Sequence, residues 1–135
     1  MTSISSQEMG RLGEEVAARY LEGLGWRIRE RNFRVPGGEI DLICQEADTI
    51  VFVEVKTRAS TRRGTPGEAV TPIKAARLLR AASAYLSQIG GWELPCRFDL
   101  VAVVGTPSRF SLSHCRHIVE ASYAVDRLHS PWQPW

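Results

Sequence analysis

The chain has 135 residues, of which 44% are hydrophobic and 24% are charged. This length and mixture are typical of one globular domain that can bury its core without disulfides, and no apolar run approaches the ~20 residues of a membrane span. The polar first ten residues lack the basic and apolar regions of a signal peptide. Three widely spaced cysteines, Cys44, Cys96 and Cys115, favour reduced thiols over a disulfide framework. We therefore expect a cytoplasmic protein without membrane contact.

The distribution of charge says more than the formal net charge of +2. Residues 56–80 contain seven basic side chains and a single acidic one, Glu68. Four more arginines lie between positions 27 and 34, where Glu30 is the only acidic residue. Local basic patches of this kind suit a phosphate-bearing partner, although either patch alone also fits an ordinary solvated surface.

The first predicted element is a helix. Apolar residues three and four positions apart predict an amphipathic helix over residues 6–24, with Ser5 or Ser6 as its N-cap. Gly10 and Gly13 weaken such a helix, so they suggest close approach of another backbone or a ligand along its N-terminal half.

Three strands are predicted to follow. Alternation predicts a strand over 26–35 with Arg27, Arg29 and Arg31 on one face, ended by a turn at Pro36. Two more strands, over 39–45 and 50–57, are joined by a short polar connection typical of a hairpin.

The C-terminal half predicts a basic loop over 58–67, a second helix over 71–88 that begins at Thr71, and an apolar central strand over 97–104. A weaker strand follows over 110–118. We expect a single α/β domain over 1–128 with element order αβββαβ, a mixed sheet flanked by helices, and an irregular tail over 129–135.

Ionisable residues converge at one end of the predicted hairpin. If its loop centres on Ala47 and Asp48, Asp41 lies opposite Glu54 and Glu39 lies opposite Lys56, all on one face. Two opposed carboxylates destabilise a bare sheet, and a hard divalent cation such as Mg²⁺ would remove the conflict. The alternative is an exposed hairpin with a Glu39–Lys56 ion pair.

Lysine is rare in this chain, because only Lys56 and Lys74 occur among its 17 basic residues. A lysine in the middle of an apolar strand, two residues after Glu54, is therefore a candidate for contact with a phosphate or a metal-bound water.

The predicted hairpin contains Asp41 and, after twelve intervening residues, Glu54-x-Lys56. This motif resembles that of the PD-(D/E)xK or restriction-endonuclease-like nuclease superfamily. More specifically, the chain resembles the uncharacterised YraN family, a small bacterial group similar to archaeal Holliday-junction resolvases. Ile40 stands where the superfamily name has proline. The matching stretches are Gly13-Glu14-x-x-Ala17-x-x-Tyr20-Leu21, Arg31-Asn32-Phe33-Arg34, Gly38-Glu39-Ile40-Asp41-Leu42-Ile43, Val51 to Arg58, Lys74, Ala81-Ala82-x-x-Tyr85-Leu86 and Arg97-Phe98-Asp99.

The resemblance implies a restriction-endonuclease-like core and a role for each matching residue. Asp41 and Glu54 would bind Mg²⁺ or Mn²⁺, with Glu39 either assisting the metal or pairing with Lys56. Lys56 would orient or activate the attacking water or stabilise transition-state charge. Glu14 would bring a further carboxylate from the first helix, or else be an ordinary exposed glutamate. Contacts with the phosphate backbone would come from Arg34, Arg58, Arg62, Arg63, Lys74 and Arg77.

Three functions follow as hypotheses. The first is a metal-dependent, Holliday-junction-resolvase-like endonuclease acting on DNA or structured nucleic acid, with a second copy of the chain or another protein as its expected partner. The second is a nucleic-acid-binding module or adaptor without turnover, and the third is a protein-interaction scaffold. A zinc site at His114-Cys115-x-His117 is disfavoured because a fourth ligand at suitable spacing is missing, and Asp99 is interpreted as structural.

Overall fold

The computed structural model describes residues 4–59 and 71–118. These form α1 (Ser6–Gly23), β1 (Arg27–Val35), β2 (Gly38–Glu46), β3 (Thr49–Arg58), α2 (Pro72–Ile89), β4 (Cys96–Thr106) and β5 (Arg109–Cys115). The first six elements confirm the predicted αβββαβ order of a restriction-endonuclease-like core. Most of the predicted basic loop and the tail over 129–135 lie outside the described residues.

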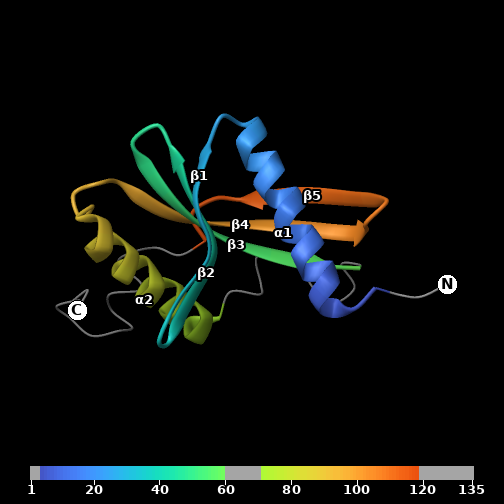
Figure 1. Cartoon of the computed structure of the whole chain (residues 1–135), viewed down its shortest axis with the longest axis horizontal. Coiled ribbons are helices and arrows are strands. Elements are labelled where there is room, and N and C mark those ends of the chain that lie inside the picture. Colours follow the sequence, from blue (N-terminus) through green and yellow to red (C-terminus); the bar gives the residue numbers. More distant parts are fainter. Residues whose placement is uncertain (1–3, 60–70, 119–135) are drawn as a thin grey trace.

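The five strands form one mixed sheet in the order β1-β2-β3-β4-β5 (Figure 1). Strands β3 and β4 are parallel, and the other neighbours are antiparallel. A parallel pair needs a long crossover connection, and α2 lies within the segment that joins β3 to β4. Strand β4 has a neighbour on each side, as its continuous apolar sequence predicts.

The two helices cover opposite faces of the sheet (Figure 1). Ile50 and Phe52 pack in the cluster beneath α2, whereas Val51 and Val53 pack in the cluster beneath α1. Alternation along a strand explains this division, since successive side chains point to opposite faces. Strand β3 is therefore buried on both sides and forms the centre of the core.

Both helices begin at the predicted caps. The Ser5 hydroxyl accepts a hydrogen bond from the Glu8 amide at 3.1 Å, and the Thr71 hydroxyl accepts one from the Lys74 amide at 3.1 Å. Helix α2 ends at Gly90, whose φ of 66° lies in the left-handed region that favours glycine.

Of the two glycines in the N-terminal half of α1, only Gly13 marks a close approach. A Cβ at Gly13 would overlap the Thr57 side chain of β3, whereas a Cβ at Gly10 would meet no atom within 4 Å. A close approach is found at Gly13, where the neighbour is the Thr57 side chain, whereas no atom of the described chain approaches Gly10 and a ligand there stays a prediction. Gly13 thus lets α1 lie directly against the C-terminal end of β3.

The prediction that Arg27, Arg29 and Arg31 share one face of β1 is wrong. Arg29 donates to the Tyr85 hydroxyl of α2 at 2.6 Å, whereas Arg31 forms an ion pair with Glu15 of α1 at 2.9 Å. The register of β1 against β2 shifts between Ile28 and Glu30. Such a bulge reverses the alternation of side chains, so Arg29 and Arg31 contact opposite helices.

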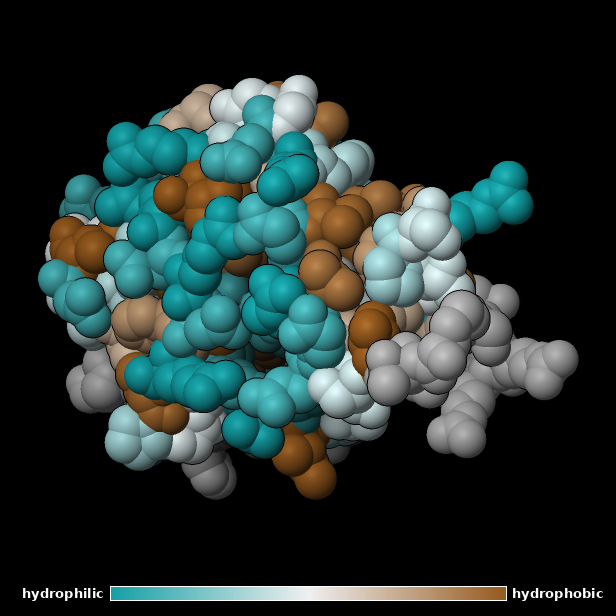
Figure 2. Space-filling view, turned by 45° about the vertical axis from the view of Figure 1, so that its right-hand side comes forward, coloured by the Kyte–Doolittle hydropathy of each residue, from teal (hydrophilic) through white to brown (hydrophobic). Residues whose placement is uncertain are grey.

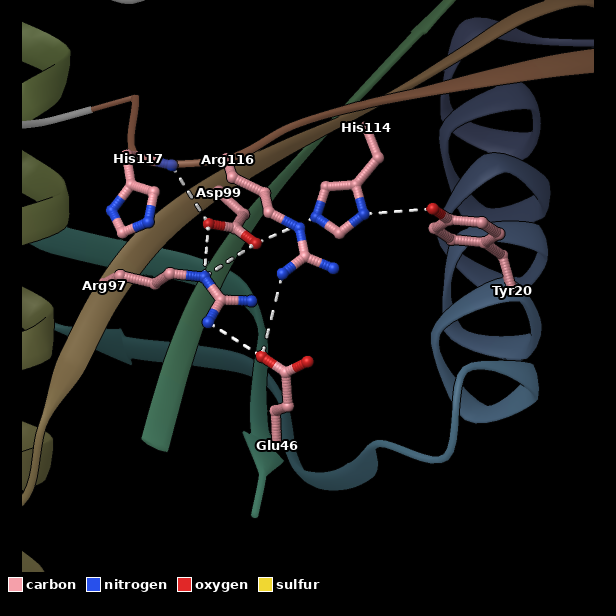
Figure 3. A network of polar contacts seen from close by, with 7 residues as sticks. All are labelled: Tyr20, Glu46, Arg97, Asp99, His114, Arg116 and His117. Atoms are coloured by element: carbon pink, nitrogen blue, oxygen red, sulfur yellow. Dashed lines mark hydrogen bonds and ion pairs between the residues drawn. The ribbon is translucent and has the colours of Figure 1, made fainter. Parts of the chain in front are cut away.

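A buried polar network joins β4, β5 and α1 (Figure 3). Asp99, with a fully buried side chain, lies 3.1 Å from Arg97 Nε and 2.8 Å from His114 Nε2, and it accepts the His117 amide at 3.2 Å. The other ring nitrogen of His114 lies 3.0 Å from the Tyr20 hydroxyl. The structure therefore supports the interpretation of Asp99 as structural, and both ring nitrogens of His114 are engaged within the protein.

The face of the molecule in Figure 2 is mostly hydrophilic, with hydrophobic residues in separate groups. Neither described helix is long and apolar enough to cross a membrane. All three cysteines are free thiols, and Cys44 is buried in the core as predicted.

The Gly10→Ala and Gly13→Ala pair tests the approach of α1 to β3. Alanine at Gly10 is expected to stabilise the protein by up to about 1 kcal/mol, because alanine is the better helix former and space is open. Alanine at Gly13 is expected to lose about 1–3 kcal/mol through overpacking against Thr57. Urea unfolding measures both, and equal effects would contradict the close contact.

The Asp99→Ala variant tests the buried network. It leaves the Arg97 and His114 side chains without their shared acceptor, so a loss of about 3 kcal/mol or more in unfolding free energy is expected. The exposed control Glu93→Ala should change that free energy by less than about 0.5 kcal/mol. A loss for Asp99→Ala as small as the control's would show that the network contributes little.

Candidate active site

The site lies where two paired strands separate. The predicted hairpin register is confirmed from Gln45↔Ile50 to Leu42↔Val53, where the pairing of β2 with β3 ends. Beyond this point β2 continues along β1 and β3 continues along β4. Asp41 and Glu54 are the next residues on the two strands, so the carboxylates stand at the fork.

Asp41 bridges the fork with its side chain. Its Oδ2 accepts a hydrogen bond from the Val55 amide of β3 at 2.7 Å. The carboxylate thus satisfies a backbone donor at the point where β2 moves away.

The even alternation predicted for β2 does not continue through Asp41. Ile40 packs in the cluster beneath α2, whereas Leu42, two residues on, packs beneath α1. The predicted pairing of Glu39 with Lys56 is therefore wrong. Glu39 lies opposite Arg34 of β1 and forms an ion pair with it at 3.3 Å, while Lys56 lies opposite Ala102 of β4.

The structure nevertheless brings the four predicted acidic residues within electrostatic range. Burial, followed by repulsion from Glu54, raises the pKa of Asp41 to about 7, and Glu14 and Glu39 act in the same direction. The backbone hydrogen bond from Val55 opposes the rise. Asp41 therefore carries a proton far more readily than an ordinary aspartate.

Glu14 belongs to this acidic group, although the sequence left its role open. Burial raises its pKa, Glu39 and Glu54 add to the rise, and a hydrogen bond with Asn32 opposes it. The neighbouring Glu15 instead forms ion pairs with arginines on the surface, which lower its pKa. The two adjacent glutamates therefore have different environments, and Glu14 is the one that lies beside the fork.

Both lysines of the chain lie at the site. Lys74 Nζ of α2 is 3.1 Å from Glu54 Oε1. The charge of Lys74, then burial, then the charge of Arg58 lower the pKa of Lys56. The sequence assigned Lys74 only to the phosphate backbone and missed its contact with Glu54. Its rarity was the signal that could have linked it to Lys56.

The predicted nucleic-acid contacts divide into three groups. Arg58 ends β3 next to the site, half-buried, and its Nη1 is buried without a hydrogen-bond partner within the described part of the chain. Arg77 and Arg34 are exposed, and Arg34 is held by Glu39. Arg62 and Arg63 lie outside the described residues.

The carboxylates suit a hard cation but do not form a complete cage. Within residues 4–59 and 71–118, no group of three or more His, Cys, Asp or Glu side chains is assembled to hold a metal ion. Mg²⁺ is commonly bound by one or two carboxylates, with waters and phosphate oxygens completing its octahedron. Asp41 and Glu54, which repel each other when both are ionised, match that two-carboxylate donor set, and Glu39 as a further ligand stays a prediction.

The pKa of Asp41 predicts how the stability of the metal-free protein changes with pH. The Asp41 carboxyl has its ordinary pKa of 3.8 in the unfolded chain, whereas its pKa in the folded protein is about 7. The folded state therefore binds the extra proton between these values, so the wild type should lose stability as pH rises through this window.

Asp41→Asn removes this titration and keeps an oxygen that can accept from Val55. The unfolding free energy of the variant minus that of the wild type should rise from about pH 4 to about pH 7 and then level off. Urea unfolding in the presence of a chelator measures it. A difference that is independent of pH would contradict the burial and repulsion at Asp41.

Comparison with known proteins identifies relatives but no activity. A UPF0102 protein of Symbiobacterium thermophilum is 50% identical over 88% of this chain and 99% of its own, and one of Lawsonia intracellularis is 36% identical over 98% and 100%. The crystal structure of SSO0001 has a TM-score of 0.40 and 18% identity, covering 93% of this chain and 58% of that one. The family model of the uncharacterised protein family UPF0102 matches residues 13–103 of this chain, which include the four acidic residues at the fork. The chain belongs to UPF0102, which is the YraN family that its sequence resembles.

Proposed function

We propose that this chain is a metal-dependent endonuclease that hydrolyses phosphodiester bonds in DNA or structured nucleic acid. The observation that carries the proposal is the fork of β2 and β3, where Asp41 and Glu54 meet beside Lys56. A structural role alone does not account for a carboxyl whose pKa is raised to about 7 by burial and a like charge.

Asp41 and Glu54 would hold Mg²⁺ or Mn²⁺ at the fork. A bound divalent cation supplies charge neutralisation at the phosphate and a water of lowered pKa. The hydrogen bond from Val55 fixes the Asp41 carboxylate, so little rearrangement of this residue is needed for binding.

Lys56 would act on the attacking water. Its lowered pKa increases the fraction of neutral amine, the form that can accept a proton. In this step the water oxygen would form a bond to phosphorus and a water proton would pass to Lys56 Nζ. The bond from phosphorus to the leaving sugar oxygen would break, and that oxygen would take a proton from solvent. The protonated ammonium then stabilises charge on the phosphate oxygens.

The phosphate backbone would be held by the basic residues around the fork. Arg58 offers a buried guanidinium nitrogen without a partner in the described chain, and the exposed Arg77 lies one turn after Lys74 on α2. Contacts with phosphates give affinity without sequence preference. Choice among branched, nicked and single-stranded substrates would then depend on shape and on a second subunit or protein partner.

A nucleic-acid-binding module without turnover is the second candidate. The observation that favours it is the ion pair of Glu54 with Lys74, which compensates one of the site's carboxylates without any metal. This module would bind nucleic acid with a steep dependence on salt and would cleave nothing.

Cleavage assays on branched, nicked and single-stranded DNA test the proposal, with Mg²⁺ or Mn²⁺ and with a chelator. The wild type is expected to cleave at least one substrate only with the divalent ion. Glu54→Gln and Lys56→Ala should each lower the rate by about 100-fold or more.

The matched control is Glu22→Gln, an identical change at an exposed position of α1, which should cleave like the wild type. Salt-dependent binding without cleavage in any divalent ion would support the second candidate instead. Equal cleavage by the wild type, Glu54→Gln and Lys56→Ala would place the activity elsewhere.

A further inference from the structure

Lys74 occupies an electrostatically unfavourable position. It lies in the first turn of α2, where the partial positive charge of the helix end disfavours a cation, and no acidic residue stands in that turn. The Thr71 cap accepts the Lys74 amide and so fixes the backbone there. Lys56, the other lysine, is close enough for its pKa to be lowered mainly by Lys74.

The contact that compensates this position is the Glu54 carboxylate. Lys74 Nζ lies 3.1 Å from Glu54 Oε1, and their side chains retain 31% and 12% of their accessible surface. The Lys74 ammonium therefore forms an ion pair with the same Glu54 carboxylate that is proposed to bind metal. A lysine cation and a divalent ion on one carboxylate repel each other, so each weakens the binding of the other.

We propose that Lys74 is an exchangeable internal cation, which holds Glu54 when the site is empty of metal and is displaced from it when a divalent ion binds. This inference rests on the proposed function, because it assumes that Glu54 is a metal ligand. The released ammonium stays tethered at the start of α2, beside Lys56, where it can bind a phosphate oxygen of the substrate. Metal binding would thereby prepare the site for phosphate.

The affinity for Mn²⁺ in the absence of nucleic acid tests this exchange, measured by the electron paramagnetic resonance of free Mn²⁺ at fixed pH. Lys74→Met removes the competing charge, so it should bind Mn²⁺ about fivefold more tightly than the wild type. Lys74→Arg keeps a cation beside Glu54 and should bind like the wild type. Arg77→Met, which removes an exposed charge one turn further along α2, should change the affinity by less than about twofold.

A second measurement uses the wild type and does not depend on a variant that folds. Since the chain contains only Lys56 and Lys74, isotope-labelled lysine gives two side-chain signals in an NMR spectrum. Titration with Mg²⁺ should shift the Lys74 signal towards that of a solvated lysine. A Lys74 signal that stays unchanged at saturating Mg²⁺ would overturn the exchange.

The outcomes separate this inference from the proposed function. If the wild type binds Mn²⁺ and Glu54→Gln abolishes that binding, but Lys74→Met binds no more tightly than Arg77→Met, the exchange is wrong and the metal site remains. If the wild type shows no Mn²⁺ binding that depends on Glu54, the metal-dependent function fails and the exchange fails with it.

Discussion

The candidate site depends on the hydrogen bond that the Val55 amide of β3 donates to the Asp41 carboxylate of β2. A hairpin whose strands stayed paired would use backbone carbonyls for its amides and would leave no gap between the strands. Here the pairing of β2 with β3 ends at Leu42 and Val53, and each strand continues along a different neighbour. The fork that results has a carboxylate on each arm. The sheet therefore creates the site by its topology as much as by its side chains.

Two carboxylates in this protein, the fully buried Asp99 and the half-buried Asp41, show how environment separates a structural group from a chemical one. Asp99 is fully buried and accepts from Arg97, His114 and the His117 amide, so its charge is compensated on several sides. Within the described residues Asp41 accepts only from the Val55 amide, and it lies beside other acids, which together with burial raise its pKa to about 7. Unsatisfied charge of this kind costs stability and is retained where a ligand can compensate it.

The supporting structure holds the fork from both faces of the sheet. On one face, Gly13 allows α1 to approach Thr57 at the end of β3, which brings Glu14 to the acids. On the other face, the N-terminal turn of α2 brings Lys74 to Glu54. Glu14 and Lys74 thus reach the fork from separate helices and join the acidic and basic residues that β2 and β3 already carry.

The sequence by itself determined the elements, the hairpin register as far as Leu42 and Val53, and the main residues of the candidate site. Periodicity, caps and turn residues mark each helix and strand, and alternation fixes which side chains of β3 face each helix, because these signals are local. The sequence did not determine which face Arg29, Arg31 and Glu39 occupy, since a bulge in β1 and the fork at Asp41 interrupt the alternation. The contact of Lys74 with Glu54, and the choice of Glu14 over Glu15, were decided only by the packing of α1 and α2 on the sheet. Such contacts join residues far apart in the chain, and no local pattern encodes the distance between them.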